Sequence, residues 1–188
     1  MRQCGECTLC CKLVPVGEME KPAGVRCQHV RWGKGCMIYA HRPDSCRLWA
    51  CAWRSETDSA GLRRPDRSHC VIDPIGMNIT KRDNDTGESE QAPAIQVWCD
   101  PDHPQAYLAP SILEFVRRRA ANGLSAIIRY NNDDALLLVA PELTGKSWLR
   151  FHSGKTPLGR LADCTDVANM IMPARATAPY YQGVAHEA

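Results

Sequence analysis

Eight cysteines within the first 51 residues are the side chains whose type and spacing could do chemistry. They are Cys4, Cys7, Cys10, Cys11, Cys27, Cys36, Cys46 and Cys51. The rest of the 188-residue chain holds only Cys70, Cys99 and Cys164, far apart in sequence. Cysteine thiolates bind metals, form disulfides or carry out redox chemistry. The clustering therefore predicts a metal site, a disulfide framework or a redox centre.

The rest of the sequence favours metal over disulfides. The N-terminus opens with arginine and cysteines and lacks the apolar segment of a secretory signal. No apolar run is long enough to span a bilayer, so no membrane association is expected. We therefore expect a cytoplasmic protein, in which thiols stay reduced. The odd number of cysteines also fits a disulfide framework poorly.

The first four cysteines form the pattern C-x-x-C-x-x-C-C over residues 4–11. Cysteines three apart can turn their sulfurs toward one point, through a tight turn or one helical turn. Gly5 permits a sharp backbone near the first pair. Cys10 and Cys11 are neighbours, so we expect their side chains to diverge. Either they serve two metals, or one of them packs without binding.

The other four cysteines are more widely spaced. Cys27 and Cys36 flank a glycine-rich turn, a common way to present two thiolates to one ion. Cys46 and Cys51 are five apart, a spacing that suits neither one helical face nor a zinc knuckle.

Weaker candidates lie between these cysteines. Glu18, Glu20 and His29 could serve as ligands, although surface carboxylates and packed or exposed histidines are commoner. Trp49 and Trp53 are four apart, so we expect them to pack over the cysteines as a hydrophobic shell or to be plain core.

Positive charge accompanies the cysteines. Residues 1–54 hold nine Lys and Arg against four Asp and Glu, whereas the whole chain has a net charge of +2. The surplus could offset thiolates, with Arg42 and Arg47 expected near the sulfurs, or it could be a solvated basic surface. The near-neutral total gives no reason to expect a nucleic-acid partner, while a protein partner remains open.

The second half of the chain carries the clearest secondary structure, and an α+β fold follows from it. Ser111 and Glu114 make a capping-box pattern at the start of the expected helix. The expected elements are a strand at 94–99, a helix near 111–121, strands at 124–130 and 135–140, and a further strand at 148–152.

Other segments give less regular patterns. Residues 71–80 alternate like a strand but are broken by Pro74 and Gly76, and residues 81–92 read as a polar loop. Met37 to Tyr39 look like a short buried strand. A weak helix is expected near 158–170.

These patterns predict a small, loop-rich protein in two regions. Residues 1–70 form a cysteine-rich metal-binding region, and residues 71–188 form an α+β region that packs with it as one compact domain. The sequence contains no serine nucleophile elbow, no complete phosphate loop and no H-E-x-x-H motif.

The N-terminal third resembles the CxxCxxCC family of zinc- or iron-chelating domain proteins. The resemblance rests on C-G-E-C-T-L-C-C at 4–11, on the loop from Glu20 into Cys27, and on I-Y-x-x-R-P-x-x-C-R at 38–47. It covers about the first 54 residues and implies metal chelation by these cysteines. A similar cysteine block occurs in flagellin lysine methylases, where it implies an iron–sulfur cluster, but this chain resembles those enzymes only in the block.

Zinc is the first expectation, because tetrahedral thiolate sites are its commonest structural use. The alternative is iron or a 4Fe-4S cluster, since C-x-x-C-x-x-C also opens the bacterial ferredoxin pattern. The fourth Cys-Pro of that pattern is absent here. Two functional classes follow: a metal-chelating module, or a redox or radical-handling enzyme component. The sequence leaves open whether the protein is an enzyme.

Overall fold

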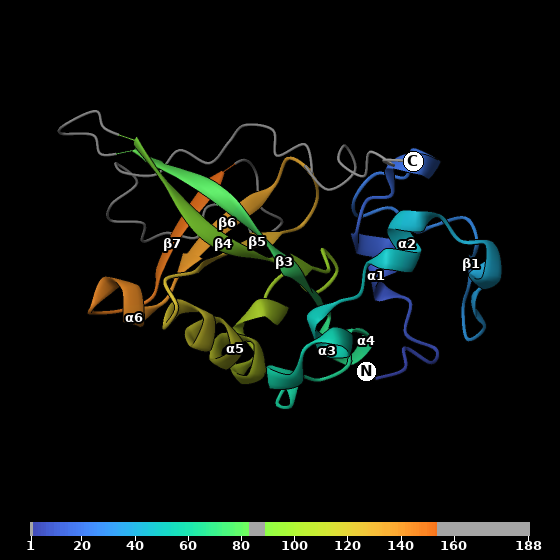
Figure 1. The fold of residues 1–188 in the computed structure, drawn as a ribbon, viewed down its shortest axis with the longest axis horizontal. Coiled ribbons are helices and arrows are strands. Elements are labelled where there is room, and N and C mark those ends of the chain that lie inside the picture. Colours follow the sequence, from blue (N-terminus) through green and yellow to red (C-terminus); the bar gives the residue numbers. More distant parts are fainter. Residues whose placement is uncertain (1, 83–88, 154–188) are drawn as a thin grey trace, which may run out of the picture.

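A mixed five-stranded sheet is the frame of the molecule (Figure 1). The computed structural model describes residues 2–82 and 89–153, so the helix expected near 158–170 and Cys164 lie outside the described residues. The strands lie in the order β3-β4-β5-β6-β7, and all neighbours are antiparallel except β4 and β5, which are parallel. They are β3 (Cys70–Arg82), β4 (Ser89–Cys99), β5 (Ser125–Arg129), β6 (Ala135–Val139) and β7 (Leu149–Ser153).

The central strands form where the sequence predicts them. Every residue of β5 and β6 is buried, which explains why neither strand alternates between apolar and polar residues. In β5 the buried residues include Ser125 and Arg129 at its two ends. Between them the side chain of Asn131 accepts hydrogen bonds from the backbone N–H groups of Asp133 and Asp134, both at 2.8 Å. This side-chain turn reverses the chain and sets the antiparallel pairing.

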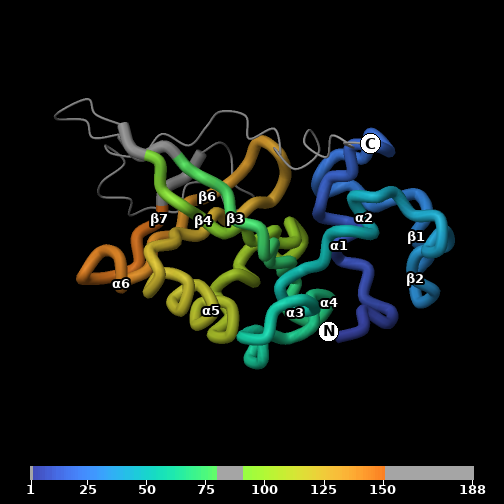
Figure 2. The backbone as a smooth tube through the Cα atoms, in the orientation of Figure 1, coloured from blue at the N-terminus to red at the C-terminus, as the bar shows by residue number. Residues whose placement is uncertain are grey.

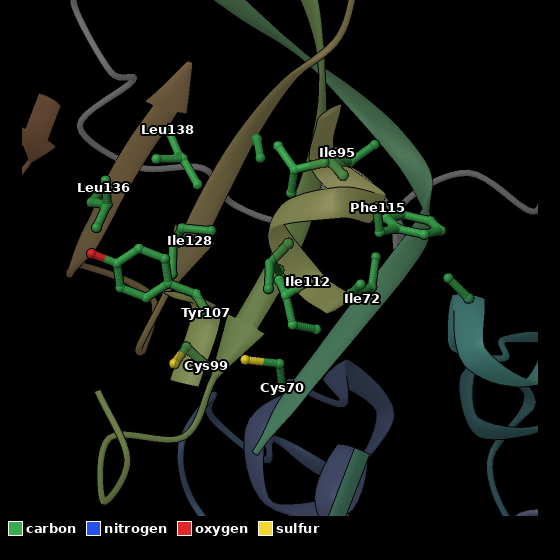
Figure 3. Close-up of a cluster of buried hydrophobic side chains, with 14 of the residues drawn as sticks. Cys70, Ile72, Ile95, Cys99, Tyr107, Ile112, Phe115, Ile128, Leu136 and Leu138 are labelled. Atoms are coloured by element: carbon green, nitrogen blue, oxygen red, sulfur yellow. The ribbon is translucent and has the colours of Figure 1, made fainter. Parts of the chain in front are cut away.

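Helix α5 (Pro110–Ala120) connects the two parallel strands β4 and β5. It follows the 3₁₀ turn η4 (Ala106–Leu108) and packs Ile112, Phe115 and Val116 into the main core (Figure 3). The predicted capping box at its start is wrong. The helix begins one residue earlier, with Pro110 at its first position, where the fixed φ of proline suits a helix. Ser111 therefore lies inside the helix, and the N-cap residue is Ala109, which has no polar side chain to act as a cap.

Strand β3 is longer than predicted. It runs unbroken through Pro74 and Gly76, and the register with β4 shifts between Asp73 and Met77 to accommodate them. The polar loop expected at 81–92 is also wrong in part, because β4 already begins at Ser89 and pairs with Arg82. The described structure thus confirms the α+β class with a larger sheet.

The N-terminal region consists of short elements joined by turns. They are α1 (Leu9–Leu13), η1 (Gly17–Met19), β1 (Val30–Arg31), β2 (Gly35–Cys36), η2 (Tyr39–His41), α2 (Asp44–Leu48), α3 (Ala52–Ser55), η3 (Thr57–Ser59) and α4 (Pro65–Ser68). The buried strand predicted for Met37 to Tyr39 is wrong. Strand β2 ends at Cys36, and Met37 and Tyr39 are 53% and 55% exposed.

This region packs against one end of the sheet (Figure 2). Leu13 of α1 lies in a small apolar cluster with Val71 of β3 and Trp98 of β4. The Lys12 ammonium adds ion pairs of 2.6 Å to Asp100 and to Asp102, which follow β4. The sheet therefore supports the cysteine-rich segment through both apolar and charged contacts.

The C-terminal side of the described chain adds one more short helix, α6 (Pro141–Thr144), before β7. Across the described ranges, no helix combines the length and the apolar character that crossing a membrane requires.

Candidate metal centre

All eight cysteines of the N-terminal segment line one cavity of about 140 Å³. Neither Cys70 nor Cys99 lines it. The lining cysteines are Cys4, Cys7, Cys10, Cys11, Cys27, Cys36, Cys46 and Cys51. Residues separated by up to 47 positions therefore meet at one place, although they come from six different turns and short elements.

The first four cysteines reach the cavity through a turn and a short helix. Cys4 and Cys7 close a tight turn in which the Cys7 N–H donates to the Cys4 carbonyl at 3.1 Å. Gly5 has φ = 56° in this turn, a value that glycine adopts without strain. Cys10 and Cys11 follow on α1.

The other four cysteines arrive from the loops and helices that follow. The Cys27 N–H donates to the Cys11 carbonyl at 2.8 Å, which ties the loop to α1. Cys36 pairs with Val30 in the β1–β2 hairpin. Cys46 lies on α2, and Cys51 precedes α3.

A carboxylate fixes helix α2 over the cavity. Glu18 accepts hydrogen bonds from the Ser45 backbone N–H at 3.0 Å and from its hydroxyl at 2.7 Å. Glu18 is thus engaged in positioning α2, and neither Glu20 nor His29 lines the cavity. The weaker ligand candidates therefore gain no support.

The thiols fall into two neighbourhoods. One contains Cys4, Cys7, Cys10 and Cys51. The charges of Cys4 and Cys7 raise the pKa of Cys51, and those of Cys7 and Cys51 raise the pKa of Cys10. The pKa of Cys46 is raised instead by the charges of Cys11 and Cys27. The cavity thus has a four-thiol side and a second side that includes Cys11, Cys27 and Cys46.

Cys10 and Cys11 join these two sides. Their thiols are hydrogen-bonded to each other, so the predicted divergence of these neighbouring side chains is wrong. This hydrogen bond is the main cause that lowers the pKa of Cys11 to about 7, with help from the charges of Lys21, Arg26 and Arg42. The same bond, together with burial, raises the pKa of Cys10 well above its usual value.

Burial favours the protonated form of three further cavity thiols. It is the largest cause that raises the pKa of Cys7, of Cys46 and of Cys51, the last to about 11. If these thiols bind a metal, they bind it as thiolates, so metal binding would release their protons.

A buried lysine lies beside the second thiol group. Lys21 is only 7% exposed, and its ammonium donates to the carbonyls of Val14, Pro22 and Lys12 at 2.6, 3.1 and 3.3 Å. No carboxylate pairs with it in the described residues. Burial lowers its pKa, and cysteines, led by Cys27 and Cys11, act in the opposite direction. Lys21 does not line the cavity, but it places a fixed positive charge close enough to interact with thiols that do.

The two arginines expected near the sulfurs behave differently. Arg42 lines the cavity, lies 4.0 Å over the Tyr39 ring, and has a buried Nε without a hydrogen-bond partner. Arg47 does not line it: its side chain is 59% exposed and pairs with Asp44 at 3.2 Å. The prediction that both side chains approach the sulfurs or a nearby carbonyl is therefore not met by Arg47.

One of the two tryptophans lies at the cavity. Trp49 lines it, and its indole N–H donates to Asp73 at 3.1 Å, whereas Trp53 packs behind it against the core. The hydrophobic-shell prediction thus describes Trp49 better than Trp53.

The sulfurs surround the cavity rather than a single point. In residues 2–82 and 89–153, no group of three or more His, Cys, Asp and Glu side chains is arranged so that it could hold a metal ion. The chemistry of the lining is nevertheless uniform, since its acidic groups are thiols and the charged side chains beside them are cationic.

Sequence reasoning missed a second cysteine pair. Cys70 at the start of β3 lies directly opposite Cys99 at the end of β4, and both are buried (Figure 3). Their hydrogen bond raises the pKa of Cys70 and lowers that of Cys99. The signal was present, because pairing two consecutive antiparallel strands brings the first residue of one beside the last of the other.

The comparisons with known proteins give no relative. No family model matches the chain, no curated protein matches it, and no solved structure matches its fold.

Proposed function

We propose that this protein binds metal through thiolates of its eight N-terminal cysteines. One observation carries the proposal: these eight cysteines line one cavity, while Cys70 and Cys99 are buried elsewhere. Thiols brought together from six separate turns and short elements need a common reason, and metal coordination supplies one. The resemblance to CxxCxxCC proteins supports the same function.

More than one metal ion fits this number of ligands. A structural zinc takes four ligands, with sulfur at about 2.3 Å, so eight thiolates exceed what one ion uses. Two such centres would use all eight thiolates, with Cys10 on the four-thiol side and Cys11 on the second side. Zinc is the first choice because it prefers four thiolates and needs no other ligand.

Binding would draw the sulfurs inward from the cavity wall. Thiolates at these centres carry net negative charge, and Lys21 and Arg42 lie where they can offset it. These two cations also reduce the cost of placing thiolates in a partly buried site.

An iron–sulfur cluster is the second candidate, and the cavity volume favours it. A cavity that holds one water molecule needs roughly 10–15 Å³. The cavity of about 140 Å³ therefore leaves space for inorganic atoms between the thiolates. Such a cluster would make the protein a redox component or part of a radical-handling enzyme.

Metal and sulfide analysis of anaerobically prepared full-length protein tests both candidates. Zinc without sulfide supports the chelating module, whereas iron with acid-labile sulfide and brown colour supports the cluster. Cys11→Ser and Cys46→Ser should lose bound metal, and Cys70→Ser is the matched control that should keep it. Reduced wild-type protein that binds neither metal would refute the proposal.

A further inference from the structure

Residues 25–48 expose an unusual amount of large apolar side chain. Of the eight large hydrophobic side chains that are exposed in the described residues, five lie here: Val25, Trp32, Met37, Tyr39 and Leu48. Trp32, in the turn between β1 and β2, is 86% exposed. We call these residues and the charges among them the 25–48 surface.

The 25–48 surface is also strongly basic. It has one acidic residue, Asp44, which pairs with Arg47 on α2. The other cations have no carboxylate partner in the described residues, and they are Arg26, Arg31, Lys34 and Arg42. The surface therefore combines unpaired positive charge with exposed apolar groups.

Two aromatic rings on this surface are held in place without being covered. The Arg26 guanidinium lies 5.6 Å from the Trp32 ring, and the Arg42 guanidinium lies 4.0 Å from the Tyr39 ring. Side chains that are ordered before binding lose less entropy when a partner covers them. The exposed rings are thus prepared for contact.

The 25–48 surface is continuous with the thiol cavity. Tyr39 and Arg42 belong to both, and Cys36 in β2 lines the cavity from the hairpin whose turn carries Trp32. The β1–β2 hairpin and α2 lie at the same end of the molecule as α1, which carries Cys10 and Cys11 (Figures 1 and 2). A molecule bound here would lie beside the cavity.

We infer that the 25–48 surface docks a protein partner that presents acidic side chains around an apolar centre. Trp, Tyr, Met and Arg are enriched in protein interfaces while Lys is depleted, and this surface has a single lysine. Its unpaired cations complement carboxylates and would steer an acidic partner. The docking inference does not depend on the proposed function. Only the further step, in which the partner exchanges metal or electrons with the cavity, rests on that function.

The other occupants fit less well. Val25, Met37 and Leu48 have no ring on which a nucleic-acid base could stack. The two exposed rings, Trp32 and Tyr39, each already have an arginine guanidinium over them. A second copy of the chain using the same surface would oppose like charges, which costs several kcal/mol. Vesicle binding by basic segments depends on the count of charges and does not require the interface composition seen here.

Selection of short random peptides on the reduced full-length protein tests the inference. We expect the selected peptides to combine Asp or Glu with a large apolar residue. Trp32→Ala and the double variant Arg31→Glu/Lys34→Glu should each weaken binding of a synthetic selected peptide at least tenfold, which is about 1.4 kcal/mol. The matched control is Arg63→Glu/Arg67→Glu, which removes an equal exposed charge elsewhere and should leave the affinity unchanged.

Several results would overturn the inference. They are selection without acidic enrichment, affinity unchanged by the surface variants, displacement of the peptide by oligothymidylate or by phosphatidylglycerol vesicles, and a dimer that Trp32→Ala abolishes. Metal analysis of each variant separates this test from the proposed function. Arg31 and Lys34 do not line the cavity, so their variants should keep their metal. Loss of peptide binding with retained metal therefore reports on docking alone.

Discussion

At the scale of single residues, Lys21 is the most informative side chain near the cavity, although it does not line it. Its buried ammonium donates hydrogen bonds to backbone carbonyls and interacts electrostatically with the thiols of Cys27 and Cys11. Burying an ammonium without a carboxylate is costly unless another negative charge compensates. Thiolates bound to metal would supply that charge.

Lys21→Met should therefore weaken metal binding. Loss of the cation removes favourable interaction with the thiolates, and we expect an affinity reduced about tenfold, equal to about 1.4 kcal/mol. Competition with a chromophoric chelator measures it. Lys34→Met, which removes an exposed charge from the hairpin, is the control and should match wild type. Equal affinities for Lys21→Met and wild type would refute this role.

Asp134 gives a prediction that is independent of metal. It is buried, its Oδ1 has no hydrogen-bond partner, and burial raises its pKa to about 6. The folded state then holds its proton more tightly than the unfolded state, whose Asp pKa is about 3.9. This group therefore makes stability fall as pH rises from about 4 to about 6.

Asp134→Asn should remove that loss. The free energy of unfolding of the variant minus that of wild type should be about 1–2 kcal/mol larger at pH 8 than at pH 4. Urea denaturation of both proteins in the same reduced, metal-free state measures the two differences. A difference that does not change with pH would contradict the assigned cause.

At the scale of elements, the joint between α1 and the sheet can be tested through its ion pairs. Lys12 bonds Asp100, whose side chain is buried, and Asp102, whose side chain is exposed. Both distances are 2.6 Å, so the two pairs differ in burial and in one further hydrogen bond, which Asp100 accepts from the Asp102 backbone N–H at 3.1 Å.

Asp100→Asn should destabilise the protein by about 1–3 kcal/mol, because it leaves Lys12 partly buried and without its enclosed partner. Asp102→Asn should have no measurable effect, because an exposed pair is screened by water and salt. Midpoints of chemical denaturation compare them. Equal effects from the two variants would show that burial does not set the strength of this joint.

The elements also show what the sequence could predict. Strands β5 and β6 were predictable because each is a short apolar run beside turn residues, a local signal. The buried strand expected at Met37 to Tyr39 failed because an apolar triplet does not say whether its side chains face a core or the solvent. The predicted start of α5 was wrong because Pro110 occupies the first helical position, which places Ser111 inside the helix rather than at its N-cap.

The candidate site was predictable in membership but not in arrangement. Clustering in sequence identified the eight cysteines that line the cavity. Their division into two neighbourhoods depends on how Cys51 folds back on Cys4 and Cys7, which is a long-range contact. The partnership of Cys70 with Cys99 likewise depends on strand register. Neither is encoded in local spacing.

At the scale of the whole molecule, apolar burial is distributed unevenly. The largest core cluster is built mainly on the sheet and α5, and a second one lies on the sheet alone. The N-terminal segment contributes Ala52 to the first of these, and Leu9, Leu13, Val14, Ala23 and Cys51 to a third cluster that it shares with two sheet residues. Burial on this scale cannot easily offset the entropy of ordering some fifty residues. The N-terminal segment therefore needs another source of stability, and metal would supply it.

We therefore predict that strong chelation under reducing conditions disorders residues 1–54 first. A structural zinc site contributes about 10–16 kcal/mol in small peptides at neutral pH, enough to decide whether this segment folds. Hydrogen exchange should show protection lost across 1–54, while β4, β5 and β6 keep theirs because their core does not involve the cavity. Unchanged exchange across 1–54, in protein shown to be reduced and metal-free, would mean that packing alone holds the cysteines together. The proposed metal function would then lose its main physical support.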